Sequence, residues 1–138
     1  MVKCLKISDS VALGLHACIL IGSAKEKLMQ AHDISEAIDV SYDHLSKVLQ
    51  TLVKHGILIS RKGKSGGFVL AVFPEKLQLK QIYEAIEGPM VFDHCLFGRA
   101  KCSVKQCTFG KLLVNINTLV VDYFTNTKLS DLLNGGKK

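Results

Sequence analysis

Three cysteines, Cys95, Cys102 and Cys107, lie in one short segment, separated by six and four residues. Glycine and basic residues accompany them, and such residues favour an exposed loop whose positive charge offsets that of an anionic metal group. Thiolates bind iron–sulfur clusters and zinc. Structural zinc sites usually space paired ligands by about two to four residues, so the spacing favours an iron–sulfur cluster, of either the 2Fe-2S or the 4Fe-4S type. A zinc site and a reversible thiol switch remain open as alternatives.

Other potential ligands are scattered along the chain. The total of five cysteines is odd, and no secretion signal is evident, which argues against a disulfide framework. Cys18 lies on an apolar helix face and is expected to be inert core. Cys4, His16 and His94 are weaker ligand candidates. The apolar stretch from Val11 to Gly22 is shorter than the roughly 20 residues that span a bilayer, so we expect a cytoplasmic protein without a membrane partner.

The first half of the chain predicts three helices. Ser8 or Asp9 can cap the first, which carries Val11, Leu15, Cys18 and Ile19 on its apolar face. A short helix over 33–38 is expected to begin at Asp33 as N-cap, with Glu36 completing a capping box. Ser41 caps a third helix, and His55-Gly56 ends it. The third helix has four apolar residues at helical spacing: Leu45, Val48, Leu49 and Leu52.

A basic, glycine-rich hairpin follows the third helix directly. Residues 57–60 and 68–71 predict its strands, and residues 61–67 its tip. A helix-turn-helix followed by such a hairpin is typical of a winged helix. The tip includes Gly63-Lys64-Ser65, but the glycine that a P-loop needs five residues earlier is Leu58. We therefore predict a DNA-binding protein and not an enzyme.

The net charge of +6 agrees with a partner that carries phosphates. The third helix is expected to enter the major groove, and the hairpin to contact the duplex backbone or minor groove. The predicted DNA contacts come from these two elements: Ser41, Tyr42, Asp43, His44, Ser46, Lys47, Lys54, Arg61, Lys62 and Lys64.

The second half of the chain predicts two more helices, at 79–87 and 109–124. The latter carries a long apolar stripe, which we interpret as a dimerisation surface. Its residues are Phe109, Leu112, Leu113, Ile116, Leu119, Val120, Tyr123 and Phe124. The fold is thus mostly α with a small β-hairpin wing. Its expected parts are a winged helix-turn-helix domain (1–88), a cysteine-rich cluster-binding loop (89–108), and a dimerisation helix with the C-terminal tail (109–134).

Four segments together resemble the Rrf-type bacterial regulators, the group that contains IscR, NsrR and CymR. They are residues 33–58, the wing at 62–68, Ile86-Glu87-Gly88-Pro89, and the three cysteines. The resemblance spans roughly residues 3–133. It implies a homodimeric winged-helix repressor or activator, and in cluster-binding members the three loop cysteines hold the iron–sulfur cluster.

The chain departs from the family pattern at two positions. Lys62 stands where the wing normally has arginine, so the planar guanidinium fork is absent, and Arg61 next to it can compensate. Gly110 stands where IscR-like members have a histidine ligand. NsrR-like members instead use an N-terminal aspartate of the other subunit, which Asp9 matches; the alternative role of Asp9 is a helix N-cap. The pattern is therefore closest to the nitric-oxide-sensitive repressor NsrR.

These inferences combine into one functional hypothesis. A homodimer places two recognition helices about 34 Å apart, so its operator should be an imperfect palindrome of double-stranded DNA. The cluster senses nitric oxide, redox state or iron supply and thereby controls repression. The alternative is a cluster-free winged-helix regulator that uses zinc or thiol oxidation.

Replacing Cys102 with alanine is expected to abolish cluster binding and to leave a folded dimer, because the loop is predicted to serve sensing and not folding. Iron analysis and circular dichroism of the variant would measure the two effects. Unfolding of the variant would contradict a purely sensory loop.

Overall fold

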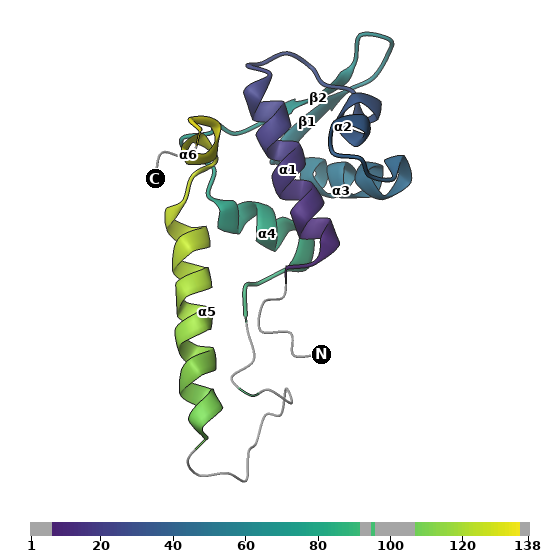
Figure 1. Cartoon of the computed structure of the whole chain (residues 1–138). Coiled ribbons are helices and arrows are strands. Elements are labelled where there is room, and N and C mark those ends of the chain that lie inside the picture. Colours follow the sequence, from purple (N-terminus) through teal and green to yellow (C-terminus); the bar gives the residue numbers. More distant parts are fainter. Residues whose placement is uncertain (1–6, 92–94, 96–106, 136–138) are drawn as a thin grey trace.

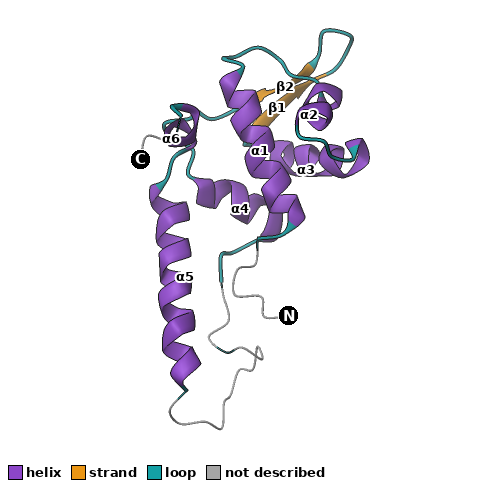
Figure 2. Cartoon of the chain, in the orientation of Figure 1, coloured by secondary structure: helices purple, strands orange, loops and turns teal. Residues whose placement is uncertain are grey.

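A computed structural model of the chain describes residues 7–91, 95 and 107–135. Figures 1 and 2 show a group of short helices and one hairpin, from which a long helix extends. The elements in chain order are α1 (Asp9–Ser23), α2 (Ala31–Ala37), α3 (Tyr42–Lys54), β1 (Leu58–Arg61), β2 (Gly67–Leu70), α4 (Leu79–Glu87), α5 (Thr108–Asn126) and α6 (Leu129–Leu133).

Helix α1 lies against both α3 and α4 and occupies the centre of the fold. Ser8 is its N-cap, and the Ser8 hydroxyl accepts a hydrogen bond from the Val11 amide at 3.2 Å. Gly14 faces α4 so closely that a Cβ there would overlap the Ile86 side chain. A larger residue at this position would therefore first displace the end of the Ile86 side chain.

Helix α2 begins two residues earlier than the sequence predicted, and the expected capping box at Asp33 and Glu36 is wrong. The N-cap is Gln30, whose side chain makes no capping bond. Met29 is held in an extended conformation by a β-bridge to Phe68, so the chain can turn into a helix directly after it. Tertiary pairing, which no local pattern encodes, thus sets this boundary.

Helix α3 begins and ends as predicted. The His44 amide donates to the Ser41 hydroxyl at 3.4 Å, which caps the helix. Gly56 follows the C-cap with φ of 75°, a left-handed conformation that glycine adopts without strain. The four predicted apolar residues of α3 are all buried.

The hairpin forms one antiparallel pair in which Leu58 lies opposite Leu70 and Arg61 opposite Gly67. The strands are shifted by one residue from the predicted 57–60 and 68–71, and the tip comprises residues 62–66. Ile57 is left outside β1, although its carbonyl still accepts from the Ala71 amide at 2.9 Å.

Helix α4 has the predicted bounds, and α5 covers the predicted 109–124 with small extensions. Helix α6 was not predicted, because five residues are too few to show a helical period. It is tied to the base of α4: the Leu129 amide donates to the Leu77 carbonyl at 2.8 Å, and the Leu79 amide to the Thr127 carbonyl at 3.1 Å. The C-terminal end of α5 is therefore anchored to the winged helix.

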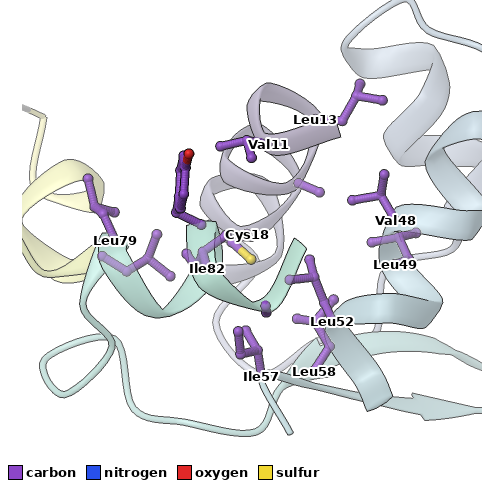
Figure 3. Packing of buried hydrophobic residues seen from close by; sticks show 14 of the residues in the cluster. Val11, Leu13, Cys18, Val48, Leu49, Leu52, Ile57, Leu58, Leu79 and Ile82 are labelled. Carbon is purple, nitrogen blue, oxygen red and sulfur yellow. The ribbon is translucent and has the colours of Figure 1, made fainter. Parts of the chain in front are cut away.

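One hydrophobic core joins α1, α3, α4 and the C-terminal elements (Figure 3). Cys18, Leu49 and Ile82 are fully buried in it, and Leu129 of α6 enters the same core. Tyr83 packs edge-on against Phe124, with ring centroids 5.9 Å apart, which joins α4 to α5. Across the described part of the chain, no helix is long and apolar enough to cross a membrane.

Candidate DNA interface and cysteine site

The outer face of α3 is polar and basic. Asp43, Lys47 and Lys54 are exposed, and Gln50 lies among them at helical spacing. Tyr42, in the first turn, is 52% exposed, whereas Ser46 is half-buried. Because the opposite face of α3 is entirely buried in the core, the helix presents this polar face outward.

Two of the predicted contact residues on α3 already have partners within the chain. The Ser41 hydroxyl caps the helix. The His44 ring nitrogen Nε2 lies 3.1 Å from the Ser10 hydroxyl of α1. Both side chains are nevertheless exposed, so each can also face a ligand.

A groove of about 520 Å³ separates α3 from the wing. Tyr42, Gln50 and Lys54 line it from α3, and Arg61 and Lys62 line it from the hairpin. Lys64, at the tip, is also exposed. Of the ten predicted DNA contacts, four therefore line this groove: Tyr42 and Lys54 on the side of α3, and Arg61 and Lys62 on the side of the wing.

Two further residues belong to this groove and were missed in the sequence. Gln50 could have been found, because it lies three residues after Lys47 and four before Lys54 on the same helix face. Gln30 also lines the groove, and its side chain donates to the Lys64 carbonyl at 3.0 Å. No sequence signal indicated Gln30, because it precedes α2 in an irregular connection.

The cysteine site is described in part. Cys107 is exposed at the N-cap position of α5 and makes no capping hydrogen bond through its side chain. Cys95 is half-buried, and Cys102 lies outside the described residues. Among the residues that are described, no three potential ligands come together in a metal-binding arrangement.

The donor chemistry at Cys107 fits an anionic iron–sulfur cluster. Its sulfur is accessible, and the amino-terminal end of the 19-residue helix α5 supplies partial positive charge. Thiolates such as those of Cys95, Cys102 and Cys107 are the usual protein ligands of these clusters.

Asp9 is the first residue of α1 and not its N-cap, because Ser8 takes that role. The Asp9 side chain is exposed at the edge of a groove of about 450 Å³, which is also lined by His16, Ser41 and His44. The capping role considered for Asp9 is therefore wrong, and its carboxylate is left available for another partner.

The apolar stripe of α5 divides into two faces. Leu113 and Phe124 are buried within the chain, and Ile116 and Val120 are half-buried. Phe109, Leu112, Leu119 and Tyr123 are more than half exposed, and Leu119 reaches 71%. Together with Ile116 they recur at alternating spacings of three and four residues, the pattern of a helix-pairing seam.

A comparison with known proteins identifies the family to which this chain belongs. Residues 7–135 match the Rrf2 family, which is described as an iron-dependent transcriptional regulator. The chain belongs to the Rrf2 family. It is a transcriptional regulator, as its relatives are, and its relatives are not enzymes.

Individual proteins that are similar to this Rrf2 regulator support the assignment to the family. A putative helix-turn-helix regulator of Aquifex aeolicus is 28% identical over 130 residues, which cover 92% of this chain and 90% of that protein. The regulator NsrR of Shouchella clausii is 31% identical over 71 residues, covering 51% of this chain and 48% of NsrR. The structure of CymR, the global cysteine regulator of B. subtilis, superposes with a TM-score of 0.79 at 24% identity and covers 94% of this chain and 97% of CymR. This likeness confirms the winged-helix fold.

Cys18 differs from Cys95 and Cys107 because it is fully enclosed in the core, as predicted. Burial raises the pKa of its thiol from 9.0 to about 12, since a thiolate there would lose its hydration. The Cys18 thiol therefore stays neutral and unreactive in the folded protein.

We expect Cys18 to resist alkylation in the native protein at pH 8 and to react once urea unfolds the chain. An unfolded Cys18 ionises above pH 9 while the folded one does not, so its contribution to the free energy of unfolding falls between pH 9 and pH 12, by at most about 1.4 kcal/mol per pH unit. The stability difference between wild type and Cys18→Ala should narrow over this range. Labelling of native Cys18 at the rate of a free thiol would contradict its burial.

Proposed function

We propose that this Rrf2 regulator is a homodimeric repressor whose operator binding is controlled by an iron–sulfur cluster that senses nitric oxide, redox state or iron supply. The observation that carries the proposal is the pairing of a basic groove between α3 and the wing with an accessible thiol, Cys107, at the amino-terminal end of α5. The family's description as iron-dependent supports the same interpretation.

The exposed seam on α5 supports a dimer. Leu112, Ile116 and Leu119 would face a second copy of the helix, and Phe109 and Tyr123 would extend the contact in both directions. Exposed apolar side chains in such a continuous stripe are typical of an interface. A two-fold pair would present two copies of α3 to one face of the duplex, so the operator would be an imperfect palindrome of half-sites about 34 Å apart.

The ligand set of the proposed site is Cys95, Cys102 and Cys107, with Asp9 of the partner subunit as the fourth ligand. When bound, the cluster supplies a centre that reacts with nitric oxide and oxidants. A carboxylate is a harder and weaker donor to iron than a thiolate, so the Asp9 contact would be the easiest of the four to break.

The first turn of α1 connects Asp9 to both functional regions. The Ser8 hydroxyl donates to the Glu87 carboxylate, just before the Gly88-Pro89 entry to the cysteine loop. Two residues later, the Ser10 hydroxyl meets His44 of the recognition helix. A displacement of Asp9 would therefore move a turn that contacts the loop entry on one side and α3 on the other. These contacts would shift the population between two poses of α3.

The proposal predicts that protein purified without oxygen is brown, with matched iron and acid-labile sulfide, and that cluster loss changes operator affinity by about 100-fold. Elemental analysis, visible absorption and titration of a duplex with loaded and cluster-free protein would measure this. Colourless protein, even after anaerobic reconstitution, would exclude the cluster, and bound zinc or a reversible disulfide would then support the cluster-free alternative.

Ser10→Ala is expected to keep the full cluster content and to reduce the affinity ratio between loaded and cluster-free protein by about 5-fold, because the hydrogen bond to His44 is removed. Ser23→Ala is a matched control: the Ser23 hydroxyl donates to the Ile19 carbonyl at the far end of α1 and has no link to α3. An unchanged ratio in Ser10→Ala would show that the signal does not pass through this hydrogen bond.

A further inference from the structure

The base of the wing is fixed to the segment that precedes α2. The Phe68 amide donates to the Met29 carbonyl at 2.8 Å, and the Met29 amide donates back to Phe68 at 3.1 Å. Gly67 makes this approach possible, since a Cβ there would lie 2.6 Å from the Met29 carbonyl oxygen. The hairpin is thus a docked element and not a free two-stranded arm.

One side chain extends this attachment to the tip of the wing. Gln30 follows Met29 directly, and its Nε2 donates to the backbone carbonyl of Lys64 at 3.0 Å. Gln30 stands at the N-cap position of α2, but its side chain makes no capping hydrogen bond. The side-chain amide bonds to the wing instead. The acceptor is a main-chain atom, which means that the bond does not depend on the Lys64 side chain.

The position of Gln30 gives this bond a role in the groove. Gln30 lines the same 520 Å³ groove as Tyr42 and Gln50 of α3 and Arg61 and Lys62 of the hairpin. A third segment, the connection that precedes α2, therefore makes a bond that ties the wing tip beside α3. In a winged helix with α3 in the major groove, this gap faces the sugar-phosphate strand between the two grooves of the duplex.

We propose that Gln30 is a positioning residue for DNA binding, which holds the wing tip at the separation from α3 that one sugar-phosphate strand requires. Without this bond the tip residues 62–66 sample more poses, and ordering them on DNA costs entropy. The Lys62 and Lys64 ammonium groups then meet the phosphates less often. This inference rests on the DNA-binding part of the proposed function and is independent of the cluster.

Gln30→Met tests the proposal, because methionine keeps the length of the side chain and removes the donor. The probe is a duplex of about 30 base pairs, long enough for two half-sites one turn apart, enriched from a random pool by the wild-type protein. We expect Gln30→Met to lower affinity by about 5-fold. The slope of log affinity against log salt should become shallower by about 1 for each phosphate that the wing no longer neutralises.

A double-mutant cycle separates positioning from direct contact. If Gln30 positions the wing, replacing Lys62 and Lys64 with alanine should weaken binding much less in the Gln30→Met background than in the wild type. Gln50→Met is the matched control: Gln50 lines the same groove from α3 and makes no hydrogen bond to the described wing, so its effect should add to that of the wing substitutions.

Each other outcome overturns the proposal in a distinguishable way. Additive effects of Gln30→Met and the lysine substitutions would mean that Gln30 contacts DNA itself. A lower thermal midpoint with unchanged affinity and salt slope would mean that the bond serves stability alone. Failure of the wild-type chain to enrich any duplex would overturn the DNA-binding function together with the positioning role.

Discussion

The close packing of α1 between α3 and α4 is the constraint on which the other features depend. At Gly14 a methyl group would displace the end of the Ile86 side chain, and around it the buried faces of α1 and α3 meet in one hydrophobic core. Interiors packed this tightly transmit displacement and do not absorb it. A displacement of α1 is therefore expected to reach both α3 and α4, which pack against it.

The proposed DNA-binding surface is assembled from three segments, each fixed by a different kind of contact. Helix α3 is held by its buried leucines, the hairpin strands by their ladder, the base of the wing by backbone bonds to Met29, and the wing tip by the side chain of Gln30. Together these contacts set the positions of the two sides of the basic groove. The charges of Lys54, Arg61 and Lys62 would attract any polyanion. The geometry that these contacts impose would favour a polyanion whose shape fits the groove.

The sequence predicted the elements well and their connections poorly. Periodicity located α3, because Leu45 to Leu52 carry a clear helical pattern after the cap at Ser41, and the Gly88-Pro89 pair marked the end of α4. It misplaced the start of α2, which a bridge from Met29 to the distant Phe68 decides. It also overlooked α6, whose Leu129 is buried in the shared core and which packs mainly against α1, far away in the sequence. Among the predicted site residues, the exposed basic residues of α3 and the wing could be found from their positions along the helix and in the hairpin. The link from Gln30 to Lys64 joins segments 34 residues apart and has no local signature.

The manner in which α5 is attached has a mechanical consequence. Hydrogen bonds hold Thr127, the C-cap of this 19-residue helix, and the adjoining Leu129 of α6 against the base of α4. Cys107 lies at the opposite end, roughly 30 Å away along the axis at about 1.5 Å per residue. A tilt of about 5° around the anchored end would swing Cys107 through roughly 2.5 Å, about the length of a metal–sulfur bond. Helix α5 can thus act as a lever whose long arm ends at a thiol, so that a slight rotation at the α4–α6 junction changes the position of Cys107.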